Sequence, residues 1–550
     1  MPLGVIETSV ANVPGTVSLL DEGTGDTANH LKHGTGKNSH IVLVPQPSDD
    51  PNDPLNWPLW KKDVAYASVF VGTIIFAAVP APMLAPATVV LSGILGVTLD
   101  EVAELSGYQL LLVGCFGLVV SALARKYGKR PQFVFAAVMG VVGTAVCIAA
   151  HEDYGTLLAG RLVQGFGTTA FESLSVAMLG DMYFVHERGV RTGIMVLCLT
   201  CMSSLVAIIG GPITARLGWR YMFIVHLPFA VAGALAVFFF VPETQFRRRD
   251  QDGRLPAHGP GPDAYADTEQ RPDKREGNVK CLESVDVAAP RPEKSYLRSL
   301  ALYNGSFTDE SPIKLSIAPL VVLVNPAVFW TILDAGIIVA FYVSLSYVLA
   351  QIWSAPPYNL TPEGNGYFYV GGLIGGLIGG IGSGALCSAT SRALARRNRG
   401  VHEPEFRLPA QAVAAAPLLG VGYFVFMWDV RHPTAAGAGY LLGAFCHGCV
   451  CCGVTVASGS AALYVLDAYK EQATEIFIVQ MTAKNLLFYG FSTFVNSWVT
   501  EDGPAQLFKV YGVASLCIVA TCIPMYVFGK LNRRWMHGFS SVQRLGAAYM

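Results

Sequence analysis

Two ionisable residues stand in a stretch of sequence that is otherwise apolar enough to cross a membrane. Arg161 and Glu172 lie in the segment 157–180, 11 residues apart. This is about three turns of an α-helix, so both side chains leave the helix on the same side. An ionisable residue at membrane depth is costly and usually faces a protein interior or a water-filled path. The spacing predicts a spanning helix that lines a polar route, with Glu172 near mid-membrane as a candidate proton acceptor and Arg161 as its electrostatic neighbour.

Each residue also has a plainer interpretation. Arg161 at the outer interface would be an anchor whose stem lies in the membrane and whose head group reaches water. Glu172 would be a structural hydrogen-bond partner of a neighbouring helix. Burial favours the protonated form of a carboxyl group, whereas a nearby cation favours the charged form. The surroundings of Glu172 therefore decide between the interpretations.

The segment 446–452, which reads Cys-His-Gly-Cys-Val-Cys-Cys, invites a metal hypothesis. Cys446, Cys449 and Cys452 share one stripe of a helix. Structural zinc sites normally bring paired ligands from two segments, whereas these residues form one continuous apolar stretch. We therefore expect small buried side chains here, no metal site and no cofactor.

The composition places all of these residues in a membrane protein. Of 550 residues, 52% are hydrophobic and 14% are charged, a balance that a soluble domain does not normally reach. The formal net charge is -1, which gives no indication of a nucleic-acid partner. The sequence contains no nucleophile elbow, phosphate loop or paired zinc motif, so we expect neither an enzyme nor an ATP-driven pump.

Twelve apolar segments approach the roughly 20 residues that a membrane-crossing helix needs. A short repeat divides them into two groups of six: Ala-Leu-Ala-Arg-Lys follows the second segment, and Ala-Leu-Ala-Arg-Arg follows the eighth. The predicted fold class is therefore an all-α membrane protein with twelve transmembrane helices in two six-helix halves. The segments are 65–87, 107–124, 131–150, 157–180, 192–213, 221–241, 327–350, 366–387, 409–427, 436–464, 475–497 and 506–528.

The polar stretches complete the predicted organisation. The predicted regions are a disordered cytosolic N-terminal tail over 1–60, an N-terminal half over 61–242, a mostly flexible cytosolic central loop over 243–325, a C-terminal half over 326–529 and a cytosolic C-terminal tail over 530–550. This orientation puts twelve Lys and Arg residues in the short cytosolic loops and three in the opposite loops, as the positive-inside rule expects. Asn359 is then the candidate glycosylation acceptor on the outer side.

Further candidate site residues lie in the second, seventh and eleventh segments. Asp334 is a candidate second proton site or a contact for a cationic substrate. Lys484 is predicted to pair with a carboxylate across the two halves. Pockets for organic substrates combine aromatic and hydrogen-bonding side chains, although an interfacial aromatic belt accounts for tyrosines equally well. The candidates of this kind are Tyr108, Gln109, Tyr342, Tyr347 and Gln351.

The eighth segment carries two interleaved rows of glycines spaced four residues apart. Such spacing makes a smooth helix face that another helix can approach closely. We predict packing between the two halves here, against Gly210 and Gly211 of the fifth segment. The rows are Gly371, Gly375 and Gly379, and Gly372, Gly376, Gly380 and Gly384.

Three motifs resemble those of the major facilitator superfamily. The runs Glu-Phe-Arg-Leu-Pro at 405–409 and Phe-Val-Asn-Ser-Trp at 494–498 resemble signatures of its fungal twelve-helix drug:proton antiporter group. The loop 121–130, Ser-Ala-Leu-Ala-Arg-Lys-Tyr-Gly-Lys-Arg, is similar to the family's motif between helices two and three, except that Arg125 stands where the motif has Asp. The segment 158–167, Leu-Ala-Gly-Arg-Leu-Val-Gln-Gly-Phe-Gly, resembles the helix-four motif. The run Gly-Gly-Pro at 210–212 resembles the helix-five antiporter motif.

The resemblance implies roles for individual residues. It makes Arg161 a proton-coupling cation and places Asp334 on a cavity-lining helix. Because Arg125 replaces an acidic residue, the resemblance does not extend to the loop's usual charge contact and gating latch. The structural motif residues that it implies are Gly128, Arg130, Gly165, Gly211 and Pro212.

Together with the motifs, the sequence predicts a proton-coupled secondary transporter that exports a small organic compound such as a drug, toxin or fungal secondary metabolite. We expect it in the cell membrane, with the vacuolar membrane as the other candidate, and acting as a monomer. Its expected partners are the substrate, protons and the lipid bilayer. Two alternatives stay open: proton-coupled uptake of a cationic nutrient such as a polyamine, with Asp334 and Glu172 as counter-ions, and a non-transporting membrane sensor of the same fold.

Overall fold

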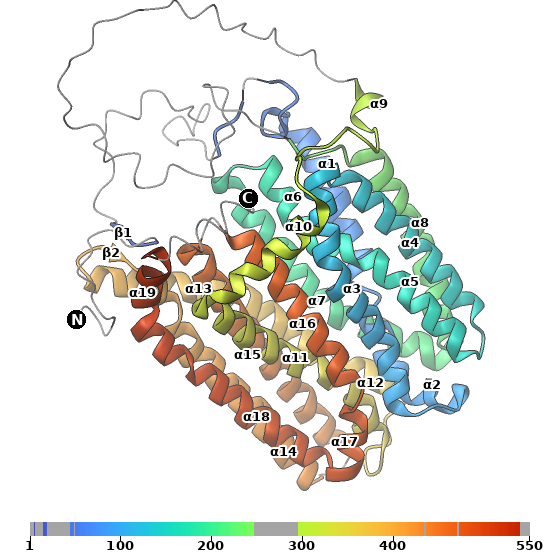
Figure 1. Cartoon of the computed structure of the whole chain (residues 1–550). Coiled ribbons are helices and arrows are strands. Elements are labelled where there is room, and N and C mark those ends of the chain that lie inside the picture. Colours follow the sequence, from blue (N-terminus) through green and yellow to red (C-terminus); the bar gives the residue numbers. More distant parts are fainter. Residues whose placement is uncertain are drawn as a thin grey trace, which may run out of the picture.

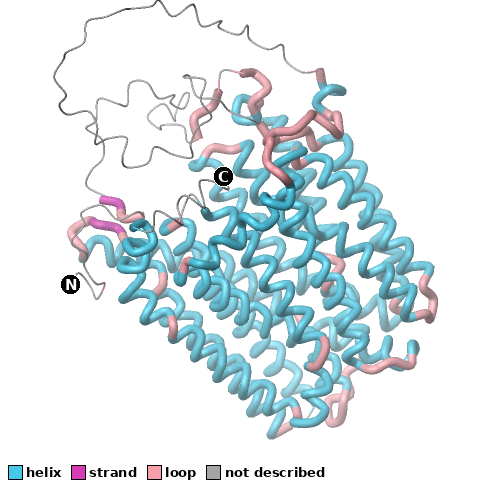
Figure 2. Tube along the Cα trace, in the orientation of Figure 1, coloured by secondary structure: helices cyan, strands magenta, loops and turns pink. Residues whose placement is uncertain are grey.

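The computed structural model describes residues 50–246, 295–433, 436–469 and 472–538, together with residues 5, 15–18 and 45–48. Most of the predicted tails, and the stretch 247–294 of the predicted central loop, lie outside these residues. The described part is built almost entirely of helices (Figure 2). Its only strands are β1 (Val17–Ser18) and β2 (Val401–His402), which pair with each other.

Helices α1 to α8 form the N-terminal half, and two of its spans begin at clear capping signals. Thr98 and Glu101 form a reciprocal capping box at the start of α3, and the Asp153 carboxylate accepts hydrogen bonds from the first N–H groups of α5, which satisfies donors that a helix start leaves unpaired. The six spans are α1 (Leu59–Thr73) continued by η4 (Ile74–Ala78), α3 (Leu99–Tyr127), α4 (Arg130–Ala149), α5 (Tyr154–Ser173) continued by α6 (Ser175–Met182), α7 (Val185–Leu217) and α8 (Arg220–Phe240). The short helices η3 (Pro54–Asn56), η5 (Pro82–Ala87) and α2 (Thr88–Leu95) flank the first span.

Helices α11 to α19 form the C-terminal half. Asn325 caps α11, and Pro326 occupies its first position, where a missing N–H costs nothing. The six spans are α11 (Pro326–Ser354), α12 (Pro362–Phe368) continued by α13 (Val370–Arg397), η9 (Gln411–Ala415) continued by α14 (Ala416–Arg431), α15 (Ala436–Ala468), α16 (Ala473–Ser492), and α18 (Pro504–Ala520) continued by α19 (Cys522–Gly538). The short helices η8 (Pro404–Arg407) and α17 (Val495–Asp502) lie between spans.

Two spans are less apolar than the others. Ten helices of the described residues are long and apolar enough to cross a membrane by length and composition. The remaining two of the twelve spans are α5 with α6, and α16. These are the spans that carry the charged candidates Arg161, Glu172 and Lys484.

The last part of the predicted central loop contains helices. It holds α9 (Tyr296–Ser299), α10 (Pro312–Ile317) and η7 (Ala318–Val324), and α10 packs against α3. The prediction of a mostly flexible loop did not include these helices, which Leu315 anchors because its apolar side chain is buried. On the opposite side of the molecule, Asn359 is exposed in the loop between α11 and α12. Its glycosylation stays a prediction.

The two halves lie side by side, the N-terminal half drawn from blue to green and the C-terminal half from yellow to red (Figure 1). We call the end of the bundle at which α1 begins and α19 ends the inner end, and the opposite end the outer end. The seam between the halves consists of α3 against α16 and of α7 against α12 and α13. Small residues let these helices approach closely: a Cβ atom at Gly107 of α3 would lie 1.9 Å from the Ser492 Oγ of α16.

Each half has its own apolar core. In the N-terminal half Phe76 stacks on Phe171 with ring centroids 5.0 Å apart. In the C-terminal half Phe341 stacks on Tyr511 at 4.4 Å. Stacked and edge-on aromatic pairs at such separations stabilise a core beyond their buried area. Apolar packing also continues across the seam, where Leu110 of α3 shares a buried cluster with Ala340 and Phe488 of the C-terminal half.

Candidate functional site

Arg161 is fully buried inside the N-terminal half, with 0% of its surface exposed. Its Nη1 donates to the Pro80 carbonyl oxygen at 2.8 Å and to Gln164 Oε1 at 3.0 Å, and its Nη2 donates to Ser106 Oγ at 2.9 Å. Its Nε donates to the Leu105 carbonyl oxygen at 3.4 Å. The interpretation of Arg161 as an interfacial anchor is therefore wrong, because every donating atom of the guanidinium has an acceptor inside the protein.

The hydrogen-bond network around Arg161 reaches four more spans. Gln164 Nε2 donates to Thr144 Oγ1 at 2.9 Å, and that hydroxyl lies 3.4 Å from His226 Nδ1. The second ring nitrogen of His226 lies 3.0 Å from the Ile75 carbonyl oxygen. A buried polar network is stabilising only when its members are satisfied. Here Arg161 is held as a fixed positive charge by α5, α4, α8 and the first two spans.

The candidate substrate contact Gln109 belongs to the same region. Its side chain is fully buried on α3, and its Nε2 donates to Thr168 Oγ1 at 3.1 Å. Thr168 in turn donates to the Phe76 carbonyl oxygen at 2.7 Å. Gln109 Oε1 has no hydrogen-bond partner among the described residues, so it is the part of this side chain that still has binding capacity.

Glu172 forms an ion pair with Lys484 across the seam. Glu172 Oε1 lies 2.7 Å from Lys484 Nζ, and Asn485 Nδ2 donates to the same oxygen at 3.5 Å. The predicted pairing of Lys484 with a carboxylate of the other half is confirmed. The predicted neighbour of Glu172 is wrong: α5 does point Arg161 and Glu172 the same way, but 11 residues at 1.5 Å each separate them by about 16 Å along the helix.

The ion pair between Glu172 and Lys484 lies near the middle of the bundle. Glu172 is ten residues from the inner end of α6, and Lys484 is 11 residues from the inner end of α16. At this depth the Glu172 side chain is still 17% exposed and the Lys484 side chain 31% exposed. Charged groups at membrane depth face protein or a water-filled path, and the two side chains of this pair keep part of their surface accessible.

Asp334 lies elsewhere, inside the C-terminal half. It is 1% exposed, and its Oδ2 accepts from Gln411 Nε2 at 2.9 Å. Gln411 also donates to the Ala457 carbonyl oxygen, which ties α11, η9 and α15 together. Asp334 Oδ1 has no hydrogen-bond partner among the described residues. The structure thus brings Glu172 and Lys484 together but does not bring Asp334 to them.

Tyr342 belongs to an aromatic cluster next to the seam. Its ring stacks on His447 with centroids 5.3 Å apart, and the rings of Tyr369 and Phe368 lie 5.2 Å and 5.8 Å from the same imidazole. The Tyr342 side chain also lies beside Ser204 of α7, in the other half. Neither ring nitrogen of His447 has a hydrogen-bond partner among the described residues. A buried polar group without a partner is costly, so this imidazole keeps unused hydrogen-bonding capacity.

The remaining polar candidates line the seam near its outer end. The ring of Tyr108 lies 5.1 Å from that of Tyr489 on the opposite half. Gln351 Nε2 donates to Thr500 Oγ1 at 3.0 Å. Tyr347 lies within electrostatic range of Arg161 across the seam, and its hydroxyl group has no hydrogen-bond partner among the described residues.

The cysteine-rich segment sits on α15. Among the described residues no group of three or more His, Cys, Asp or Glu side chains has a geometry that could hold a metal ion. Cys446, Cys451 and Cys452 are buried, and Cys451 lies beside Tyr342. The residues therefore pack as small apolar side chains do.

The loop between the second and third spans fixes the inner end of the N-terminal half. The backbone N–H groups of Lys129 and Arg130 donate to the Glu243 carboxylate at 3.0 Å and 3.2 Å. Gly128 has a φ of 101°, and a Cβ there would lie 2.1 Å from Glu243 Oε2, so only glycine fits. Burial raises the pKa of Glu243, against the opposing effect of the backbone N–H groups that donate to it.

Arg130 of the same loop also stabilises the inner end of the N-terminal half. It is 1% exposed. Its Nη2 donates to the Phe238 carbonyl oxygen at 2.7 Å, its Nε donates to the Leu300 carbonyl oxygen at 3.1 Å, and its Nη1 donates to the Val241 carbonyl oxygen. This side chain therefore ties the loop to the end of α8 and to the residues that follow α9.

Arg125, which stands where the family motif has an acidic residue, pairs with Glu475 across the seam. Glu475 lies in the first turn of α16 at the inner end. The loop therefore does contact the other half through an ion pair. The cation, Arg125, belongs to the loop, and the anion, Glu475, belongs to the other half. Sequence reasoning missed Glu475, and the signal was available: a cation in place of an acid requires an acid on the partner helix.

The glycine motifs do pack the seam, with different partners from those predicted. Gly211 meets Gly366 of α12, where a Cβ on Gly211 would lie 2.8 Å from the Gly366 Cα. The predicted packing of the eighth segment against the fifth, between the two halves, is confirmed. Only the predicted partners Gly210 and Gly211 are wrong for the glycine rows, because Gly211 lies beside Gly366 at the start of the segment and the rows lie farther along it. The row Gly372, Gly376 and Gly380 faces Ser204, Thr200 and Leu197 of α7, whereas the row Gly371, Gly375 and Gly379 faces α15 of its own half.

Gly165 and Pro212 complete the motif residues. Gly165 of α5 packs against α3, where a Cβ would lie 2.8 Å from the Gln109 carbonyl oxygen. Pro212 lies inside α7, five residues before its end. Both positions are in helices that reach the seam, which agrees with a structural role for the motifs.

The fold and the motifs match a known family over most of the chain. Residues 66–486 match the family model of the Major Facilitator Superfamily. The chain belongs to the Major Facilitator Superfamily. Members of this superfamily and fold are transporters, so the protein is a multi-pass membrane transporter and not an enzyme.

Relatives in this superfamily are fungal. An uncharacterized MFS-type transporter of Schizosaccharomyces pombe is 25% identical over 96% of this chain and 93% of its own length. Protein HOL1 of Saccharomyces cerevisiae is 24% identical over 95% of each chain. A probable efflux pump, mfs2, of Aspergillus flavus is 24% identical over 70% of this chain and 83% of its own length.

A solved major facilitator structure shares the fold. The crystal structure of a D-xylose-proton symporter superposes with a TM-score of 0.58 at 13% identity, covering 86% of this chain and 99% of that one. At this identity the likeness concerns the fold alone. It agrees with twelve spans in two halves.

Proposed function

We propose that this major facilitator protein is a proton-coupled exporter of a small organic compound, and that the ion pair between Glu172 and Lys484 is its coupling element. The observation that carries the proposal is the position of this pair. It joins the two halves at mid-depth with a separation of 2.7 Å, and both side chains are partly exposed. A charge pair that bridges two moving bodies biases their arrangement.

The proton acts through the ion pair. While both groups are charged, their attraction holds α5 to α16. Protonation of Glu172 removes the negative charge and leaves Lys484 with an uncompensated charge at membrane depth, which is costly. The halves then favour an arrangement in which Lys484 meets water or an acceptor group of the substrate. Substrate and proton therefore compete at one place, which is what exchange transport requires.

Several contacts join the two halves at the outer end of the seam. The Asp100 carboxylate accepts from the backbone N–H groups of Asn496 and Ser497 in the other half, at 2.9 Å each. Arg216 pairs with Glu363 at 3.1 Å. With the contact of Gly211 and Gly366, these bonds close the outer end. A substrate would enter from the inner side, which suits export from the cytosol.

The substrate class follows from the side chains at the seam. Tyr342, Tyr369 and His447 offer ring faces. Among the described residues the ring nitrogens of His447 and the side-chain oxygen of Gln109 have no hydrogen-bond partner. Such a combination suits an organic compound with an aromatic or flat apolar body and a few polar groups. The relative named as a probable efflux pump is consistent with export, and we place the protein in the cell membrane.

The alternative of polyamine uptake has less support. It uses Glu172 and Asp334 as joint counter-ions for a cation. Glu172 already has Lys484 as its cation, and Asp334 lies among α11, η9 and α15, away from the pair. A second cation at Glu172 would be repelled by Lys484.

The experiment is a flux measurement in proteoliposomes with an imposed pH gradient. Proton movement is followed with a trapped pH-sensitive dye while candidate compounds are added, drawn from fungal toxins, drugs and polyamines. The expected result is a compound that drives protons in the direction opposite to its own movement. Polyamines that move together with protons would overturn export in favour of uptake. Transport of a compound without any proton movement would overturn the coupling.

A further inference from the structure

The N-terminal segment 15–18 docks on the inner end of the C-terminal half, almost 400 residues away in the chain. Val17 pairs with His402 and Ser18 pairs with Val401 in the antiparallel ladder of β1 and β2. Gly15 has a φ of 86°, and a Cβ there would lie 2.9 Å from the Asp467 carbonyl oxygen. The left-handed backbone and the close approach both require glycine, so the sequence of this segment is fitted to its place.

A second contact secures the same region. Val5 is 1% exposed and packs in one apolar cluster with Ala395 and Phe406 of the C-terminal half. The prediction of a wholly disordered N-terminal tail is therefore wrong for these described residues. Only a few apolar and small side chains are involved, which is why composition did not reveal them.

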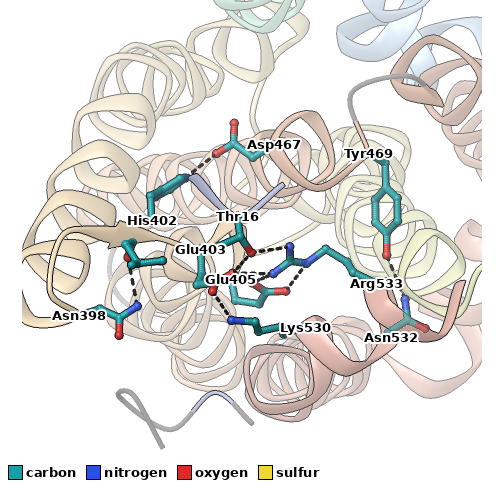
Figure 3. Close-up of polar contacts among 11 residues, drawn as sticks. Thr16, Asn398, His402, Glu403, Glu405, Asp467, Tyr469, Lys530, Asn532 and Arg533 are labelled. Atoms are coloured by element: carbon teal, nitrogen blue, oxygen red, sulfur yellow. Dashed lines mark hydrogen bonds and ion pairs between the residues drawn. The ribbon is translucent and has the colours of Figure 1, made fainter. Parts of the chain in front are cut away.

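The docked segment completes a buried cluster of charges (Figure 3). Arg533 of α19 donates from Nε to Glu405 Oε1 at 3.0 Å, and from Nη2 to Glu405 Oε2 at 2.8 Å and Glu403 Oε2 at 2.9 Å. Lys530 pairs with the other oxygen of Glu403. The cluster therefore contains two cations and two carboxylates, and its charges balance.

Thr16 is the member of the segment that enters this cluster. Its Oγ1 donates to Glu403 Oε2 at 2.7 Å and accepts from Arg533 Nη1 at 3.4 Å. Burial alone raises the pKa of Glu403, but hydrogen bonds from Lys530, Thr16 and Arg533 together lower it. The hydroxyl group thus faces a charged carboxylate at hydrogen-bond distance.

We propose that Thr16 is a phosphorylation site and that its modification releases the segment 15–18 from the C-terminal half. A protein kinase would transfer the γ-phosphoryl group of ATP to Thr16 Oγ1. The bond between the β and γ phosphates breaks as the new O–P bond forms, ADP leaves, and the hydroxyl proton passes to a base of the kinase.

The charges explain the release. The phosphoryl group removes the hydroxyl donor and brings a charge of about -1.5 to -2 against Glu403. Among the described residues, Arg533 and Lys530 already pair with Glu403 and Glu405, so the added charge has no further cation in this cluster. Thr16 is only partly buried and begins an extended segment, a form that a kinase can bind when the segment opens.

Hydrogen exchange of the full-length protein in lipid nanodiscs tests the release. The readout is the exchange of the backbone amides of Val17 and Ser18, followed in a peptide that covers residues 10–20. Thr16→Glu carries the negative charge, and Thr16→Gln is its uncharged control of equal size. We expect exchange in Thr16→Glu to be about tenfold faster than in Thr16→Gln, as local opening of a short ladder allows. Equal exchange in the two variants would overturn the proposed release.

A double variant separates charge repulsion from loss of the hydroxyl group. Glu403→Gln leaves Lys530 and Arg533 facing one carboxylate, so Thr16→Glu combined with Glu403→Gln should dock again and regain slow exchange. Failure of this rescue would contradict the charge argument. Mass spectrometry of the protein isolated from its own cells tests the modification itself: phosphate on Thr16 supports it, and unmodified Thr16 under all growth conditions overturns it. These measurements need no substrate, so they stand apart from the proposed transport.

Discussion

The buried polar network around Arg161 and the buried polar groups inside the C-terminal helices differ in how completely they are hydrogen-bonded. In the N-terminal half Arg161 lies at the centre of a network in which its guanidinium, Gln164, Thr144 and His226 all have partners. In the C-terminal half the comparable buried groups have atoms without hydrogen-bond partners among the described residues. These atoms belong to Asp334, Gln411, Tyr423, His447 and Tyr464.

The difference indicates a division of labour. A satisfied network holds one arrangement rigidly, so the N-terminal half presents a fixed positive charge. Each unsatisfied buried group costs about 1–3 kcal/mol, so the C-terminal half gains stability whenever water, a proton or a substrate reaches these atoms. We therefore expect the N-terminal half to stay rigid during the transport cycle. The C-terminal half is the better candidate for the half that changes when a proton or a substrate binds.

The largest expected effect comes from breaking the network of the N-terminal half. Arg161→Gln cannot reach the acceptors on Pro80, Leu105 and Ser106. We expect a loss of about 3 kcal/mol in the free energy of unfolding, since unpaired buried acceptors cost about 1–3 kcal/mol each, together with loss of transport. Thermal unfolding in detergent measures the first effect. Arg161→Lys, which keeps the charge but not the planar fork, should recover only part of the stability. An unchanged melting temperature in Arg161→Gln would contradict the claim that the Arg161 network makes the N-terminal half rigid.

An intermediate effect is expected where the halves meet at the inner end. Arg125→Glu places like charges opposite each other at Glu475, and we expect transport to fall by about tenfold because the pair is partly screened by solvent. The double variant Arg125→Glu with Glu475→Arg restores opposite charges and should recover most of the rate, as a direct interaction requires. Initial rates in proteoliposomes measure both. Equal rates in the single and double variants would show that the pair has no part in the cycle.

The smallest effect on stability is expected in the C-terminal half. Asp334→Asn removes a buried carboxyl group that, among the described residues, has one oxygen without a hydrogen-bond partner and no ion pair. We expect the free energy of unfolding to change by no more than about 1 kcal/mol, since replacing an unpaired buried charge by a neutral group of the same shape is nearly neutral or stabilising. Thermal unfolding beside Arg161→Gln gives the comparison. A loss as large as that of Arg161→Gln would remove the distinction between the halves.

The number and order of the spans could be predicted from the sequence because apolar length is a local property. The two spans that carry Arg161, Glu172 and Lys484 were recognised as spans although their composition is less apolar than that of the others. The pairing of Lys484 with a carboxylate was also within reach, since an isolated charge at membrane depth requires a partner.

The partners themselves could not be predicted. Whether Arg161 or Lys484 lies beside Glu172 depends on how α5 and α16 are placed across the seam, and helical spacing gives only the direction of a side chain. The neighbours of His447 could not be predicted either. In the sequence it belongs to a cysteine-rich segment, whereas in the structure it lies among the rings of Tyr342, Phe368 and Tyr369. The docking of residues 15–18 rests on contacts with residues nearly 400 positions later, which no local pattern encodes.

The most direct test of the central claim is the pH dependence of transport in Glu172→Gln, with Glu363→Gln as the matched control. Both substitutions remove the carboxylate of an ion pair that bridges the halves, but Glu363 pairs at the outer end with Arg216, whose side chain is 72% exposed. We expect transport by Glu172→Gln to lose its pH dependence and transport by Glu363→Gln to keep it. Full activity with unchanged pH dependence in Glu172→Gln would contradict a role for this ion pair in proton coupling.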